Sequence, residues 1–231
     1  MKPPVLFDRV VSATEKSVIG VDVTVQGTLA YNTGGYFNNS VEFTTNRSNR
    51  LNYKTNVMAS MNAYTIEYWF NPNYNMVAGV PSDGTDHNAI SLQNVIGSPT
   101  GSDWCFISEA NSNWRFYRTG SSYYMSPSPL NWTAGTWYHI AYVLDYNKID
   151  ATDYIQIYLD GIKKMSYTSA INSVPLVVNS FVLGAENDVV SVALLGINRN
   201  VCNLKMYDYA KTDFSDRFNE RGGLNDQALI I

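Results

Sequence analysis

Alternation of side chains with a period of two residues constrains this chain more than any other feature. In the segment "YTIEYWF", residues 64–70, one set is Ile66, Tyr68 and Phe70, and the other is Thr65, Glu67 and Trp69. Successive side chains of a β-strand point to opposite faces, so the segment predicts a strand with one apolar face.

A second segment, "TWYHIAYVLD", alternates in the same way but is apolar on both faces. One face carries Trp137, His139, Ala141 and Val143, and the other carries Tyr138, Ile140, Tyr142 and Leu144. A strand that is apolar on both sides is buried on both sides, so this segment is predicted to lie inside a sheet of a layered fold.

Two further segments extend the pattern. "YIQIYLDGIKKMSY" predicts a hairpin in which Ile155, Ile157 and Leu159 share a face and Asp160-Gly161 forms the turn. "VCNLKMYDY" predicts a strand with Cys202, Leu204 and Met206 on one face and Asn203, Lys205 and Tyr207 on the other.

One segment has a helical spacing. Phe214 and Phe218 are four residues apart, Thr212 is a candidate N-cap, and Gly222-Gly223 would end the helix. Many short strands with one short C-terminal helix predict an all-β, two-sheet antiparallel sandwich. The expected organisation is an extended N-terminal arm over residues 1–17, one domain over 18–223, and a C-terminal tail over 224–231.

Composition excludes several classes of function. The chain has 231 residues, a net charge of −4 and a sequence pI near 5.1, which argue against a nucleic-acid partner. The sequence contains no run of 18 apolar residues, so no membrane-spanning segment is expected. No secretory signal is expected from the first residues, which lack an apolar stretch. Charged residues are only 16% of the chain, whereas it has 17 Tyr, a balance that suits contacts with sugars or protein surfaces. Cys105 and Cys202 are predicted to be buried free thiols.

Four segments, taken in order, resemble the concanavalin A-like lectin/glucanase superfamily on its laminin-G and pentraxin-like branch. They are "YTIEYWFNP", "GTWYHIAYVLD", "IQIYLDGIKK", and "FVLGAEND" followed by "GINRNVCNLKMYDYAKTDFS". The resemblance covers about residues 18–220 and implies a jelly roll of two antiparallel sheets. The fold serves many functions, so the site must be argued separately.

The acidic segment Glu186-Asn187-Asp188 has three interpretations. A glycosidase needs two carboxylates beside the scissile bond, and the second glutamate that glucanases of this fold carry is missing here. The resemblance to pentraxin-like proteins implies a calcium site built from these three residues and Asp103, because calcium binds carboxylate and amide oxygens. The third interpretation is a polar turn, since Asp, Asn and Gly favour turns.

Aromatic residues beside polar loops are the candidates for sugar contacts. They are Trp104, Tyr123, Tyr124 and Trp132, with Trp114 interpreted as a core residue. Tyr123 and Tyr124 are adjacent, so in an extended segment one of them points away from the core. His139 is interpreted as a core histidine, and His87 as a loop residue without an evident partner.

Together these features predict a non-enzymatic carbohydrate-binding or adhesion module displayed on a bacteriophage virion, as a capsid or tail decoration. Its partners would be glycans or a host-surface polysaccharide, and other virion proteins through the terminal arms. The alternatives are a purely structural decoration protein and a glycoside hydrolase of the same fold.

Overall fold

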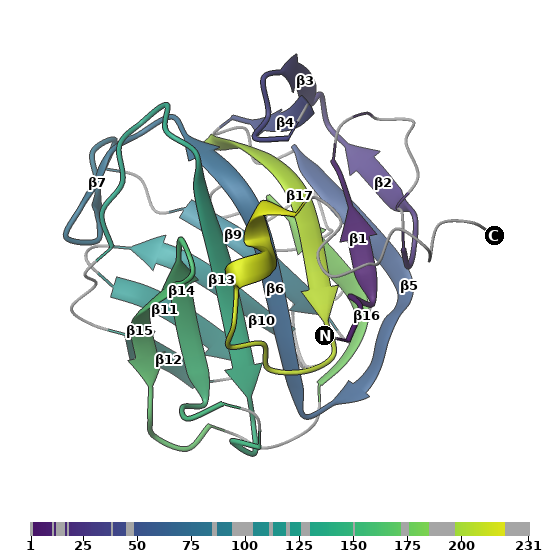
Figure 1. Cartoon of the computed structure of the whole chain (residues 1–231), viewed down its shortest axis with the longest axis vertical. Helices are drawn as coiled ribbons and strands as arrows, with labels where there is room; N and C mark the ends of the chain where they lie inside the picture. Colours follow the sequence, from purple (N-terminus) through teal and green to yellow (C-terminus); the bar gives the residue numbers. More distant parts are fainter. Residues whose placement is uncertain are drawn as a thin grey trace.

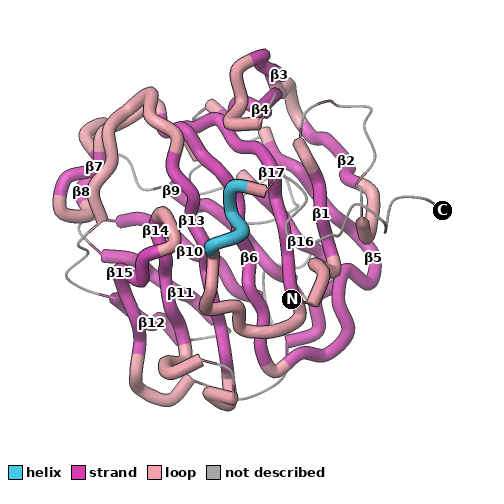
Figure 2. Tube along the Cα trace, viewed as in Figure 1, coloured by secondary structure: helices cyan, strands magenta, loops and turns pink. Residues whose placement is uncertain are grey.

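Two antiparallel β-sheets stack face to face and contain most of the described residues (Figure 1). The computed structural model describes residues 2–10, 12, 17, 19–37, 39–44, 49–84, 87–93, 104–110, 113–118, 121–125, 130–149, 151–171, 176–184 and 197–219. Within these residues, strands and loops make up the fold apart from one helical turn, as the colours of Figure 2 show. The predicted all-β antiparallel sandwich is therefore confirmed.

The sheet nearer the viewer in Figure 1, here called the front sheet, has eight strands in the described part of the chain. Their order is β15 (Ile162–Tyr167), β14 (Ile155–Leu159), β13 (Tyr138–Asp145), β6 (Ala63–Pro72), β17 (Arg199–Tyr207), β4 (Asn39–Phe43) and β3 (Ala30–Thr33), with β1 (Leu6–Asp8) also paired to β17. All of these pairs are antiparallel.

The sheet behind it, here called the back sheet, has seven strands among the described residues. Their order is β12 (Ser121–Met125), β11 (Asn113–Arg118), β10 (Trp104–Ala110), β9 (His87–Gln93), β16 (Leu176–Leu183), β5 (Arg50–Met61) and β2 (Val23–Gln26). A small hairpin of β7 (Met76–Val77) and β8 (Val80–Pro81) projects at one end.

The main core lies between the two sheets and contains the faces that alternation predicted. Ile66, Tyr68 and Phe70 of β6 are fully buried there. Strand β13 lies beside β6, with Ile140 opposite Tyr68 and Tyr142 opposite Ile66. The predicted core position of Trp114 is also confirmed. Alternation works here because each of these strands presents one face to the other sheet.

The outer face of the front sheet is covered as well, which explains why β13 is apolar on both sides. Ala141 and Val143 point outward into a second cluster, in which Phe214 and Ala210 cover them. Phe214 directly precedes the helical turn η1 (Ser215–Phe218), which lies across the front sheet in Figure 1. The prediction that β13 is buried on both faces is therefore confirmed.

The predicted hairpin turn has the expected backbone. Asp160 and Gly161 have φ angles of 53° and 80°, the left-handed pair that a two-residue hairpin turn requires. The side chain of Asp160 adds a second restraint, because its Oδ1 accepts a hydrogen bond of 2.9 Å from the backbone N–H of His139.

The predicted faces of β17 are wrong at Cys202. Asn203 has a φ of 57°, and the register with β6 shifts between Cys202 and Lys205. This bulge inserts an extra residue, so Val201 and Leu204 both enter the core, whereas Cys202 lies beside the outward-facing Trp69. Cys202 is buried, as predicted.

The expected N-terminal arm is part of the sandwich instead. Residues Leu6–Asp8 form β1 and pair with β17, with Leu6 opposite Met206. Leu6, Phe7 and Val10 are buried. A three-residue strand is too short to show alternation, so the sequence pattern did not reveal it. The expected tail, residues 224–231, lies outside the described residues.

The C-terminal helix is shorter than predicted. It is a single 3-10 turn over Ser215–Phe218 with Phe214 at the N-cap position and no side-chain cap, so Thr212 does not cap it. The residues predicted to end it, Gly222-Gly223, lie outside the described residues. No helix in the described part of the chain is long and apolar enough to cross a membrane.

Asp8 carries a carboxyl group into the interior beside β17. Tyr53 donates a hydrogen bond of 2.7 Å to its Oδ2, and the backbone N–H of Val10 donates one of 2.8 Å to its Oδ1. Burial raises the pKa of Asp8 above its ordinary value of 3.8, more than these two hydrogen bonds lower it. Ionised Asp8 therefore opposes folding.

The first prediction follows from that raised pKa. The stabilisation from protonated Asp8 is complete below the unfolded pKa and is lost as the pH rises through the folded pKa. We therefore compare the free energy of unfolding of the wild type with that of Asp8→Asn. The wild-type value minus the variant value should fall as the pH rises above 3.8. The slope should be about 1.4 kcal/mol per pH unit in the range where Asp8 is protonated only in the folded state. Urea unfolding of both proteins between pH 3.5 and 7 measures this difference. A difference that rises with pH would contradict the assignment.

Candidate functional site

The acidic segment that the sequence singled out lies outside the described residues, as does Asp103. Glu186, Asn187 and Asp188 follow β16, whose last residue is Leu183, and Asp103 directly precedes β10. Calcium binding at these four residues therefore stays a prediction. Within the described ranges, no three His, Cys, Asp or Glu side chains gather in a way that could hold a metal ion.

Three of the predicted sugar-binding aromatics lie on the back sheet. Trp104 begins β10 opposite Gln93, whereas Tyr123 and Tyr124 lie on the edge strand β12. The side chains of all three residues lie outside the described part of the structure, so their role in sugar contacts stays a prediction.

The fourth aromatic, Trp132, does not form an open platform. Only 4% of its surface is exposed, because its ring packs edge-on against Phe70 and Tyr74, with centroid distances of 5.2 Å and 5.9 Å. A sugar ring stacks on the exposed face of an aromatic side chain, and Trp132 offers no such face. The interpretation of Trp132 as a surface platform is therefore corrected to that of a buried wall.

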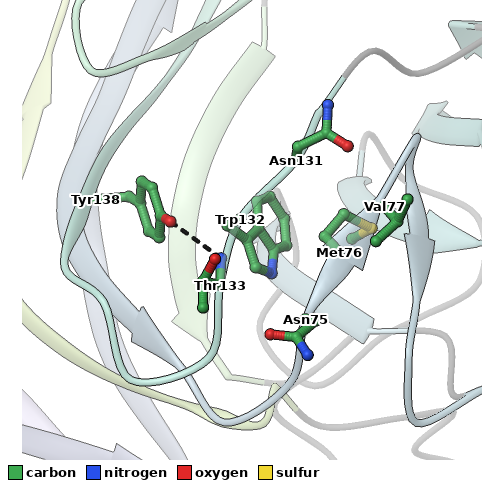
Figure 3. A pocket seen from close by; sticks show the side chains of 7 residues that line it. All are labelled: Asn75, Met76, Val77, Asn131, Trp132, Thr133 and Tyr138. Carbon is green, nitrogen blue, oxygen red and sulfur yellow. Dashed lines mark hydrogen bonds between the residues drawn. The ribbon is translucent and has the colours of Figure 1, made fainter.

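Trp132 instead forms part of a pocket of about 540 Å³ at one end of the sandwich (Figure 3). The lining residues come from the β7–β8 hairpin and from the chain leading into β13: Asn75, Met76, Val77, Asn131, Trp132, Thr133 and Tyr138. These side chains offer amides, hydroxyl groups and apolar surface. None of them is a carboxylate, a histidine or a cysteine.

Backbone hydrogen bonds fix the two walls of the pocket to each other. Met76 and Trp132 exchange two of them, at 2.9 Å and 3.1 Å, and Gly79 donates one of 3.0 Å to the carbonyl of Leu130. The Oδ1 of Asn131 accepts a hydrogen bond of 2.8 Å from the backbone of Ala78. The pocket is therefore held in one shape before any ligand arrives, which reduces the entropy cost of binding.

Two polar side chains at the rim are oriented by the same loops. The Oδ1 of Asn75 accepts a 2.8 Å hydrogen bond from the backbone of Ala134, which leaves its amide Nδ2 as a donor at the exposed rim. The hydroxyl of Tyr138 accepts a 2.9 Å hydrogen bond from the backbone of Thr133, as Figure 3 shows, and its own proton remains free to be donated. Both groups suit the oxygen atoms of a polar, uncharged ligand.

A chain of stacked side chains supports the pocket from behind, and it corrects the interpretation of His87. His87 is buried in β9, where its ring stacks on Tyr74 at 4.1 Å and its Nε2 lies 3.2 Å from Asp83. The hydroxyl of Tyr74 accepts a 2.6 Å hydrogen bond from the buried Arg199. His87 is therefore a packed strand residue with partners, and not a loop residue without one.

The other histidine, His139, belongs to a buried polar cluster beneath η1, as predicted for a core histidine. Its Nε2 lies 3.9 Å from Glu67 Oε2, and Nδ1 has no hydrogen-bond partner among the described residues. Burial, together with the nearby charges of Lys211 and Lys205, holds the pKa of His139 well below its usual range. The imidazole is therefore neutral at physiological pH and shielded from solvent, so it lacks the access that a general base needs.

Glu67 is the centre of this cluster. Lys211 Nζ lies 2.9 Å and 3.1 Å from the two carboxylate oxygens, and Tyr207 donates a hydrogen bond of 3.0 Å to Oε1. Lys211 also lies 2.8 Å from Asp216 of η1. Because both partners of the pair are buried and hydrogen-bonded to each other, the cluster is a structural clamp between η1 and β6.

The pocket residues Asn75, Thr133 and Tyr138 are not marked by any motif in the sequence. Tyr138 was placed on a strand face, and Asn75 belongs to the asparagine-rich stretch "FNPNYN". That density of amide side chains directly after a predicted core strand was the available signal.

The chain thus combines an antiparallel two-sheet sandwich with a pocket at its rim that is lined by uncharged side chains. A family model described as "Concanavalin A-like lectin/glucanases superfamily", of laminin G type, matches residues 43–213. The chain belongs to this superfamily, as the sequence resemblance predicted. No curated protein sequence matches it.

Similar solved structures show the same fold at low sequence identity. Domain 4 of AbnA, an extracellular arabinanase from Geobacillus stearothermophilus solved in complex with arabinotriose, has a TM-score of 0.60 at 15% identity, with 95% of this chain and 98% of that chain covered. The receptor-binding domain of botulinum neurotoxin type G has a TM-score of 0.60 at 13% identity, with 94% and 51% covered. Botulinum neurotoxin type C, whose cell entry depends on interaction with two ganglioside molecules, has a TM-score of 0.60 at 12% identity, with 90% and 48% covered. The chain spans about half the length of the two neurotoxin chains.

The second prediction tests the structural role of the Glu67 cluster. Lys211→Met removes the nearest cation from the buried carboxylate of Glu67, which keeps only Tyr207 and, at 4.0 Å, Lys205, so we expect the free energy of unfolding to fall by about 3–5 kcal/mol. The double variant Glu67→Gln/Lys211→Met removes both charges and should recover most of that loss. Urea unfolding followed by tryptophan fluorescence compares the three proteins. A single variant as stable as the wild type would show that the pair is not a clamp.

Proposed function

We propose that this protein is a non-catalytic carbohydrate-binding module that holds glycans at the pocket formed by Asn75, Val77 and Tyr138, with the buried Trp132 behind them. The observation that carries the proposal is the chemistry of the pocket wall, in which amide and hydroxyl groups stand beside aromatic and aliphatic surface. Sugars present hydroxyl groups and apolar C–H faces together, so such a wall complements them. The wall is also preformed by the backbone bonds between its two sides.

The described site does not favour catalysis. Glycoside hydrolysis requires two carboxylates on either side of the scissile bond. The pocket wall has none, and Glu67, the carboxylate buried beneath η1, is engaged by Lys211. A binding function needs only the groups that the pocket holds.

The structural neighbours support the proposal without establishing it. One of them was solved in complex with arabinotriose, another is a receptor-binding domain, and a third belongs to a toxin that interacts with gangliosides. We extend glycan binding from these proteins to this chain as part of the proposal.

Display on a bacteriophage virion remains a prediction. Two terminal arms were among the features that favoured it, and the N-terminal one is built into the front sheet as β1. The proposal for glycan binding does not depend on the place of display. Weak sites on any multivalent assembly would gain affinity from copy number.

The third prediction uses two valines of one hairpin as a matched pair. Val77 lines the pocket, whereas its strand partner Val80 does not, and both are exposed. An arginine at position 77 would fill the rim with a long charged side chain, so we expect Val77→Arg to weaken glycan binding about tenfold, equivalent to about 1.4 kcal/mol. Val80→Arg adds the same charge outside the pocket and should bind like the wild type.

A glycan array first identifies the ligand, once with calcium and once with EDTA, and isothermal titration then compares the variants. Binding in both conditions, lost in Val77→Arg alone, is the expected result. Binding that requires calcium would move the site to Asp103 and the Glu186–Asp188 segment. No retained glycan under either condition would contradict the proposed function.

A further inference from the structure

A row of polar side chains crosses the outer face of the front sheet, apart from the pocket. Its members come from four neighbouring strands, β6, β17, β4 and β3, and are Asn71, Asn200, Glu42 and Asn32. Asn200 stands opposite both Asn71 and Glu42 in the register of β17. Their strand neighbours Phe70, Val201 and Val41 fill the core, so alternation places the row on the opposite face.

The row is held in place by its own hydrogen bonds but is not saturated by them. Asn32 Nδ2 donates to Glu42 Oε2 at 2.9 Å and to Asn200 Oδ1 at 3.0 Å. Across the described residues, no further side-chain hydrogen bond engages Glu42 Oε1, Asn200 Nδ2 or the amide of Asn71. All four side chains are half-buried. Fixed acceptors and donors therefore face the solvent side by side.

An aromatic ring lies next to this row. Trp69, two residues before Asn71 on β6, points to the same outer face, and the ring of Tyr36 stacks on it with a centroid distance of 3.5 Å and an interplanar angle of 9°. The indole Nε1 of Trp69 donates a 3.1 Å hydrogen bond to the carbonyl of Arg217, and this bond fixes the orientation of the indole beneath Tyr36. Tyr36 is 38% exposed. Since Trp69 covers one face of the tyrosine, the opposite face is the one available to a ligand.

The loop that carries Tyr36 is shaped for this position. It joins β3 to β4, and a β-carbon at Gly35 would lie 2.1 Å from the carbonyl oxygen of Asn39. Gly34 has a φ of 127°, in the region that favours glycine. The two glycines let the loop fold back over the sheet and place Tyr36 on Trp69.

We propose that Tyr36, Asn71, Asn200 and Glu42 form a second sugar site, which takes a neutral hydroxyl-rich ring. The apolar face of the sugar stacks on Tyr36, while Glu42 Oε1 accepts hydrogen bonds from its hydroxyl groups and the asparagine amides donate to its oxygens. The carboxylate of Glu42 repels acidic sugars, which sets the preference for neutral ones. This inference extends the proposed function but uses no residue of the pocket.

The fourth prediction tests this site with arabinotriose, maltotriose and cellotriose as neutral probes and trigalacturonate as the acidic one. We expect a neutral probe to shift the NMR signals of the side-chain amides of Asn71 and Asn200. Tyr36→Ala should weaken that binding about tenfold through loss of the stacking surface. Tyr36→Phe keeps the ring and should bind like the wild type. Glu42→Gln should weaken binding of the neutral probe about tenfold through loss of charge-assisted hydrogen bonds.

The Val77→Arg variant separates this site from the pocket. Amide shifts at Asn71 and Asn200 that persist in Val77→Arg and vanish in Tyr36→Ala support the second site. Sugar binding that survives Tyr36→Ala and Glu42→Gln but is lost in Val77→Arg overturns this inference and leaves the proposed function standing. Unmoved amides with all four probes also overturn it. Melting temperatures of each variant verify that the fold is retained.

Discussion

The ion pair of Lys211 and Glu67 determines which part of the front sheet is open to ligands. It ties the chain after β17 to the outer face of β6, and Asp216 adds a second contact with Lys211 from η1. A buried carboxylate is strongly unfavourable without its partner, so this segment has one stable position. In that position Phe214 covers the middle of the sheet, and the outer face stays accessible toward Asn71 and Asn200.

Local alternation predicted most of the fold because each long strand faces one core. It was correct for β6, β13 and β14, whose inward side chains repeat every second residue. It was wrong on β17 because the left-handed backbone of Asn203 inserts a bulge that no apolar pattern marks. It missed β1, whose three residues carry no period, and which depends on pairing with residues about 200 positions away.

The candidate sites were harder to predict, for a physical reason. Sequence reasoning looked for scarce groups, such as paired acids and clustered aromatics, because these carry distinctive chemistry. The described polar surfaces are built mainly from asparagine, which the same reasoning assigns to turns. Asn75 serves both purposes, since its Oδ1 holds the loop at Ala134 while its Nδ2 faces outward at the rim. Nothing in the local sequence separates such a residue from one that only makes a turn.

This use of asparagine also explains how a chain with only 16% charged residues can present specific polar surfaces. An amide loses less hydration on binding than a carboxylate or an ammonium group, so a site of amides needs fewer compensating contacts. Its attraction for a neutral ligand is also barely screened by salt. Each such site is weak by itself. The two proposed sites belong to one sandwich, so a glycan long enough to reach both would form its second contact at a high effective concentration.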